Sequence, residues 1–225
     1  MYARRAWLPV VVTLLPTLTV AVCYALSASG GYIPACNPLL EGCTSISSSG
    51  RHGAAYWLFK AGVIPTAALL AVFWLWCRSW FLSLGLADSF GLRAMLWLGL
   101  ISAAFLVLYS VFLGSSGEIY QLLRRFGVTV HFSFSYLAQV LLLNRLWDAR
   151  RAGVLPVPNA LTTLMFATTL LLFAFALYSI PVGQLIPDPD DTIINTIEWN
   201  FALLLIGWYL LAGLAWRASV TPEAR

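Results

Sequence analysis

Six long apolar stretches, separated by shorter polar segments, follow one another along the chain. Each is at least as long as the roughly 18 apolar residues that mark a membrane-spanning helix, because about 20 residues at 1.5 Å each cross a hydrocarbon core of about 30 Å. None alternates at every second residue, as a membrane β-strand does. The pattern therefore predicts an all-α polytopic membrane protein, a single six-helix domain over residues 1–225, with spans at about 7–28, 55–77, 94–113, 127–147, 159–180 and 194–216.

Composition supports this class. Hydrophobic residues make up 60% of the chain and charged residues only 10%, whereas soluble domains carry about 25% charged residues. The first apolar stretch follows two arginines and could belong to a cleaved signal peptide. Its length of roughly 22 residues exceeds the 7 to 15 of a signal-peptide core, so we interpret it as the first span.

The arginines and lysines predict the orientation. With the N-terminus in the cytoplasm, nine arginines lie inside and four basic residues lie outside, as the positive-inside rule expects. The inner residues are Arg4, Arg5, Arg78, Arg93, Arg145, Arg150, Arg151, Arg217 and Arg225, and the outer residues are Arg51, Lys60, Arg124 and Arg125. Six spans return the C-terminus to the cytoplasm. A compact bundle of this kind suits a bacterial inner membrane, although a eukaryotic internal membrane fits the same residues.

The net charge of +4 reflects the arginines that the predicted topology places on the cytoplasmic side. No clustered basic patch with interleaved aromatic residues is present, so we expect no nucleic-acid partner.

This topology places a polar loop, residues 29–54, outside the membrane. The loop holds Cys36 and Cys43, and the intervening "NPLLEG" contains a proline and a glycine that suit a tight turn. In an oxidising compartment these cysteines are predicted to form a disulfide, the alternative being two unpaired thiols at the membrane surface. Cys23 and Cys77 are interpreted as small packing residues.

Three ionisable residues lie in the outer halves of the predicted spans, about 6 to 9 Å from the outer ends: Lys60, His131 and Glu198. Such residues are costly in lipid and are therefore candidates for function. Ser135 and Gln139 follow His131 at helical spacing and extend it into a polar stripe. The structural alternatives are that Lys60 extends outward to the interface, that Glu198 favours a helix N-terminus, and that the stripe forms interhelical hydrogen bonds.

The same residues permit catalysis without specifying it. His131 could act as a general base or metal ligand with Glu198 as its partner. Two histidines without an H-E-x-x-H helix are a weak metal signal, and the serines of "SISSSG" lack a G-x-S-x-G elbow. We predict no cofactor and no metal site.

Three segments carry a resemblance to a known family: "CTSISSSGRHGAAYWLFKAGV", "VTVHFSFSYLAQVLL" and "NTIEWNFALLLIGWYLL". Together they resemble the FRAG/DRAM/SFK family of six-span proteins, which includes the damage-regulated autophagy modulators and the Golgi protein of GPI-anchor lipid remodelling. The resemblance covers residues 7–217 and places the family's I-S-x-x-G element, its fourth-span histidine and the opening of its last span on Ile46, Ser47, Gly50, His131, Glu198 and Trp199. Many members have prolines soon after the glycine, whereas this chain reads "RHGAAYW". The resemblance implies a protein that acts on or senses lipids.

Two main hypotheses follow. In the first, the protein has a lipid-associated or regulatory role, and its outer polar residues bind a headgroup: Ser47, Arg51, His52, Lys60, Ser135, Gln139 and Trp199. In the second, His131 and Glu198 serve a lipid-modifying hydrolase or transferase. A small transporter is a weaker alternative, because the inner halves of the spans are nearly uncharged and show no broken helices. Membrane lipids are the expected partners, with a membrane protein or a second copy as further options.

Overall fold

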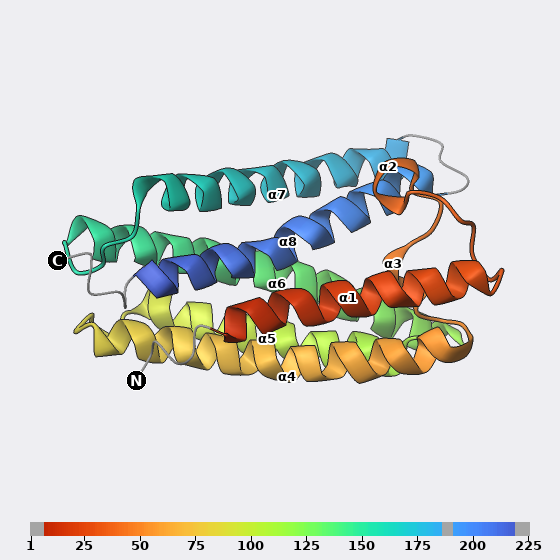
Figure 1. Ribbon diagram of the computed structural model, residues 1–225, viewed down its shortest axis with the longest axis horizontal. Helices are drawn as coiled ribbons and strands as arrows, with labels where there is room; N and C mark the ends of the chain where they lie inside the picture. Colours follow the sequence, from red (N-terminus) through yellow and green to blue (C-terminus); the bar gives the residue numbers. More distant parts are fainter. Residues whose placement is uncertain (1–6, 186–190, 219–225) are drawn as a thin grey trace.

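The computed structural model describes residues 7–185 and 191–218, without the side chains of 183–185, and every regular element in this part of the chain is helical (Figure 1). Arg4, Arg5 and Arg225, which contributed to the predicted orientation, lie outside the described residues. The elements are α1 (Leu8–Ser29), α2 (Pro38–Glu41), α3 (Ile46–Ser49), α4 (Gly53–Ser83), α5 (Phe90–Phe112), α6 (Glu118–Arg151), α7 (Asn159–Leu185) and α8 (Thr192–Ala218).

Six of these helices are long and apolar enough to cross a membrane, which confirms the predicted six-span fold. Two predicted boundaries need correction: α6 begins at Glu118, well before Gly127, and α4 continues to Ser83, past Cys77. Hydropathy marks only the part of a helix that lies in lipid, whereas backbone hydrogen bonding continues into the polar flanks. The 34 residues of α6 extend about 51 Å, so its ends project beyond a hydrocarbon core of about 30 Å.

The long helices run alternately up and down, so the bundle has two different ends (Figure 1). One end, which we call the loop end, holds α2, α3, the α5–α6 connection and the start of α8. The other, which we call the turn end, holds the α4–α5 turn and the α6–α7 connection. The start of α1 and the end of α8 both lie at the turn end, as an even number of spans requires.

The interior is filled by aromatic side chains and by glycines that allow close helix packing. Trp80 and Trp216 stack with ring centroids 5.1 Å apart near the turn end, and Trp74 and Trp208 are fully buried. A Cβ added at Gly99 would collide with the ring of Trp74. Because lipid offers no hydrophobic drive for helix association, packing of this kind stabilises the bundle.

Helix α7 is the least enclosed of the six long helices. It packs mainly against α8 and less against α6, and many of its large apolar side chains are exposed, among them Leu170, Phe173 and Leu177. Because α7 packs only loosely against α6, a groove remains between these two helices.

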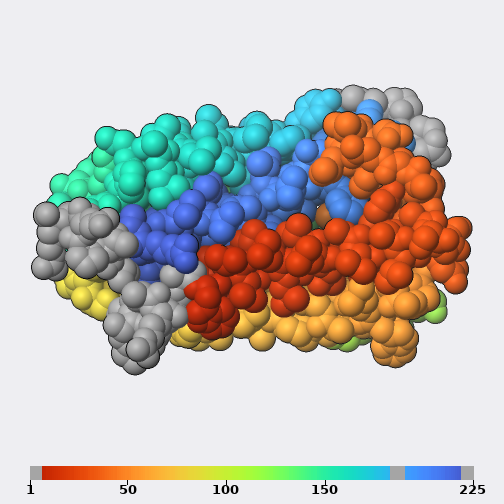
Figure 2. Space-filling model, in the orientation of Figure 1, coloured from red at the N-terminus to blue at the C-terminus, as the bar shows by residue number. Residues whose placement is uncertain are grey.

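The predicted disulfide is confirmed, because Cys36 and Cys43 are bonded. It closes a loop within residues 36–51, which we call the capping segment. Three side chains of α8 donate hydrogen bonds to backbone carbonyls of this segment. Figure 2 shows the α2 region packed over one end of α8. The bonds are from Asn195 Nδ2 to the Gly42 carbonyl (3.0 Å), Trp199 Nε1 to the Thr44 carbonyl (2.8 Å) and Asn200 Nδ2 to the Leu39 carbonyl (2.8 Å).

Gly42 is needed at the contact of the capping segment with α8. Its φ is +60°, which disfavours other residues, and an added Cβ would collide with the carbonyl oxygen of Thr192. The turn predicted from "NPLLEG" therefore depends on glycine both for its conformation and for its approach to α8.

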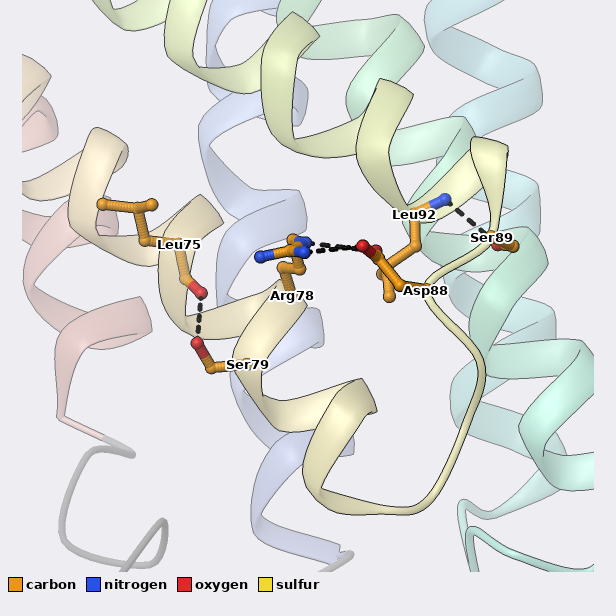
Figure 3. A network of polar contacts seen from close by, with 6 residues as sticks. All are labelled: Leu75, Arg78, Ser79, Asp88, Ser89 and Leu92. Atoms are coloured by element: carbon orange, nitrogen blue, oxygen red, sulfur yellow. Dashed lines mark hydrogen bonds and ion pairs between the residues drawn. The ribbon is translucent and has the colours of Figure 1, made fainter.

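The turn end is stabilised by paired charges (Figure 3). Arg78 of α4 donates to Asp88 through Nη2 at 2.7 Å and through Nε at 3.2 Å, and Arg145 of α6 pairs with Asp148 at 2.9 Å. The Ser89 hydroxyl caps α5 by accepting from the Leu92 amide at 3.3 Å. The bidentate bond to Arg78 lowers the pKa of Asp88 from its usual range.

Candidate functional site

A groove of about 1060 Å³ lies at the loop end, between α6 and the α7–α8 pair. Its lower part is apolar, with Phe132 and Leu137 from α6 facing Phe173 and Leu177 from α7. Three of these side chains, Leu137, Phe173 and Leu177, are 44 to 52% exposed. Since α6 and α7 are spanning helices, this exposed side opens toward lipid chains.

The mouth of the groove is polar and basic. Arg51 of the capping segment and Arg124 and Arg125 of α6 line it, together with Ser45, Ser47, Ser48 and Gln121. The Arg51 guanidinium donates to the Ser47 hydroxyl, while its buried Nε has no hydrogen-bond partner. Three arginines therefore line one opening.

Two acids, Glu198 and Asp191, also line the groove. Glu198 projects from the second turn of α8 toward the Ile46 backbone N–H at the start of α3, and it attracts the Arg51 guanidinium. Glu198 thus partly balances Arg51 and connects the capping segment with α8.

Arg51 lies in an unfavourable electrostatic environment. Burial lowers its pKa from the usual range, and the positive charge of Arg124 lowers it further, against the opposing effects of Tyr109 and Glu198. An arginine keeps its charge under such conditions. An anion bound at the mouth would relieve the repulsion between the two guanidinium groups.

A smaller cavity of about 70 Å³ adjoins the groove on the bundle side. The lining of this cavity is mostly apolar, but His131, Glu198 and Tyr209 reach it. Four residues line both spaces: Tyr109, Val128, Phe132 and Glu198. The two predicted catalytic residues therefore share one small cavity, next to the polar mouth of the groove.

The polar stripe on α6 lies in the bundle core and connects three helices. His131 Nδ1 is 2.9 Å from the Ser102 hydroxyl and 3.1 Å from its carbonyl oxygen, and Ser102 is 2.6 Å from the Ser135 hydroxyl. Gln139 Nε2 donates to the Leu205 carbonyl of α8 at 2.9 Å. These are the interhelical hydrogen bonds that the sequence suggested as the structural alternative. They also fix the ring of His131 at the cavity wall.

The other predicted binding residues lie outside the groove lining. Lys60 joins α4 to α5: its Nζ donates to the Tyr56 hydroxyl and to the Val111 carbonyl (3.1 Å) and lies 4.0 Å from the Tyr56 ring centroid. His52 stacks on Tyr32 with centroids 5.1 Å apart. Trp199 holds the capping segment through its indole N–H. Of the predicted set, Ser47, Arg51 and Glu198 meet in the groove, and His131 lies in the adjoining cavity.

Sequence reasoning missed Arg124 and Arg125 as site residues, because it counted them only as outer charges. A signal was present. Arg124 is seven residues before His131, and residues seven apart in a helix lie on nearly the same face. The polar stripe, followed upward along α6 beyond the predicted start of the span, leads to the mouth of the groove.

No family model, curated protein or solved structure matches the chain. The fold itself is that of a multi-pass integral membrane protein. Among residues 7–185 and 191–218, no three His, Cys, Asp or Glu side chains come together in an arrangement that could hold a metal ion.

Proposed function

We propose that the protein is a lipid-associated membrane protein that holds the headgroup of a membrane amphiphile at its loop end. One observation carries this proposal: the groove between α6 and α7 is polar at its mouth, apolar below, and open along its side to the membrane. A lipid has the same division into a polar head and apolar chains, so it matches the groove along its whole length.

The proposal places the loop end outside the cell, in a bacterial inner membrane. The Cys36–Cys43 disulfide supports an oxidising compartment on that side, and six of the ten basic residues within the described chain belong to the opposite end. The resemblance to the FRAG/DRAM/SFK family supports a role in lipid chemistry or lipid sensing.

The test uses a photoactivatable lipid with a diazirine in its acyl chain, in membranes that contain the full-length protein. We expect crosslinks on groove residues of α6 and α7. The variant Ala176→Trp fills the groove from α7, since Ala176 lines it, and should remove these crosslinks. Ala174→Trp is the matched control, because Ala174 is exposed on the same helix but outside the groove lining. Equal crosslinking in both variants would contradict the proposal.

A second candidate function is lipid modification, favoured by His131 and Glu198 in the cavity that adjoins the groove. In this case the groove would bind a substrate, and the two residues would act as base and acid on an atom near the mouth. The lipid profile of the host membrane should then differ between cells with and without the protein. His131→Gln and Glu198→Gln should each abolish this difference without lowering the amount of folded protein. If both variants only reduce folded protein, these residues are structural and the catalytic hypothesis fails.

A further inference from the structure

We propose that the groove selects an anionic phospholipid, with its phosphate bound between Arg51, Arg124 and Arg125 and its acyl chains between α6 and α7. This inference rests on the proposed lipid association and narrows the ligand to one chemical class. It follows from the charges at the mouth, from the geometry of guanidinium groups and from the open side of the groove.

Among the residues that the structure describes, the lining of the groove holds more basic than acidic side chains. Three arginines and two acids line the groove, and the Glu198 carboxyl lies close to the Ile46 backbone N–H. Within residues 7–185 and 191–218, the ion pairs are Arg78–Asp88 and Arg145–Asp148, both at the turn end. Arg124 and Arg125 therefore line the groove without an ion-pair contact to any carboxylate of the described residues.

Neighbouring guanidinium groups favour an oxyanion such as a phosphodiester. Each guanidinium presents a planar fork that can donate two parallel hydrogen bonds, and the two non-bridging oxygens of a phosphodiester can accept them. Arg51 has a buried Nε without a partner, and Ser45, Ser47 and Ser48 supply hydroxyl groups on the same side. The repulsion between Arg51 and Arg124 is relieved when an anion lies between them.

The open side of the groove determines how the ligand reaches the arginines. Below the mouth, α6 contributes Phe132, Tyr136 and Leu137, and α7 contributes Phe173 and Leu177. A phospholipid can move into this space from the surrounding leaflet with its chains mainly against apolar side chains, although Ser133 and Ser179 also line the groove. A free phosphate ion would reach the same arginines from water and would leave the apolar part without a ligand.

The experiment measures binding to the purified full-length protein by native mass spectrometry, with four probes added one at a time. The probes are dioleoyl phosphatidylglycerol, dioleoyl phosphatidylcholine, diolein and inorganic phosphate. We expect phosphatidylglycerol to bind at least about tenfold more tightly than diolein, a difference of about 1.4 kcal/mol, because one charge-assisted hydrogen bond to the phosphate is enough to supply it. Phosphatidylcholine has the same phosphodiester without net charge and should bind more weakly than phosphatidylglycerol.

Three variants locate the binding. The double variant Arg51→Gln, Arg124→Gln should lose at least about tenfold in affinity for phosphatidylglycerol, while diolein binding stays the same. Arg125→Glu reverses the charge of an exposed residue and should weaken phosphatidylglycerol even if the double variant fails to fold. Arg93→Gln is the control, because Arg93 is exposed at the start of α5, at the turn end.

The outcomes separate this inference from the proposed function. If all three lipids bind equally, are insensitive to the arginine variants and are lost in Ala176→Trp, lipid association stands and the anionic phospholipid is wrong. If inorganic phosphate binds as tightly as phosphatidylglycerol, the ligand is a soluble phosphate and this inference is overturned. If no lipid binds at all, both proposals fail.

Discussion

The two ends of the bundle use arginine in opposite ways. At the turn end, Arg78 is held by two bonds to Asp88, and Arg145 pairs with Asp148. At the loop end, Arg124 and Arg125 line a groove with no carboxylate in contact among the described residues. An arginine that pairs with a carboxylate of its own protein contributes to the fold, whereas neighbouring arginines without such a pair can bind an external anion.

The surroundings of the arginines at the two ends of the bundle differ as well. The turn end is close to the stacked pair Trp80 and Trp216 and has short connections. The loop end is covered by a segment that a disulfide closes and that α8 holds through three side chains. We therefore expect changes at the turn end to reduce the stability of the whole bundle, and changes at the loop end to alter binding with smaller losses of stability.

The largest effect is expected from Trp216→Ala at the turn end. It removes a fully buried ring that stacks on Trp80, and such truncations cost about 3–5 kcal/mol. The midpoint of thermal unfolding in detergent should fall markedly, while lipid binding per folded molecule should stay unchanged. A loss of binding with little loss of stability would contradict the division between the two ends.

Removal of the disulfide should have an intermediate effect, confined to the loop end. Closure of a short loop by a disulfide is worth about 2–4 kcal/mol in small domains, and here that contribution acts on the capping segment. Cys36→Ser with Cys43→Ser should increase hydrogen exchange of the amides in residues 36–51 and leave exchange at Trp74 and Trp208 unchanged. Faster hydrogen exchange throughout the bundle would show that the capping segment stabilises the whole bundle and not only the loop end.

Trp199→Phe should have a smaller effect that remains local. It deletes the bond to the Thr44 carbonyl, at a cost of about 1 kcal/mol. Trp208→Phe is the matched control, since it deletes a bond from the indole N–H to the Thr169 hydroxyl away from the capping segment. Trp208→Phe should lose more stability, because Trp208 is fully buried, but only Trp199→Phe should weaken lipid binding. Equal lipid binding in the two variants would show that the capping segment does not contribute to the binding site.

The smallest effect is expected from acid acting on Asp88. Because the bond to Arg78 lowers the pKa of Asp88 in the folded state, the pair adds stability above the usual aspartate pKa and loses this contribution as the pH falls through the lowered value. The side chains are one-third exposed, so the contribution is small. Asp88→Asn should flatten the decline in thermal stability below about pH 4, which a pH series of unfolding curves measures. An unchanged pH profile would rule out this pair as its cause.

The six-helix fold could be predicted from the sequence because hydropathy reports directly on the membrane. The Cys36–Cys43 pair was also accessible, since only those two cysteines share a loop. The groove was not. Its width depends on how far α7 lies from α6, and its charge depends on the nine residues of α6 before Gly127, which hydropathy assigns to a loop. Lys60 shows the same limit, because depth in the membrane says nothing about the direction in which a helix presents a side chain.

The open side of the groove between α6 and α7 has a consequence for how binding should be described. A ligand that arrives sideways stays within one leaflet and diffuses in two dimensions, so the quantity that sets occupancy is its mole fraction among neighbouring lipids. Occupancy would then follow changes in leaflet composition even when the total amount of the lipid in the cell is constant. A protein that binds a lipid in this way would respond to the distribution of that lipid between the two leaflets.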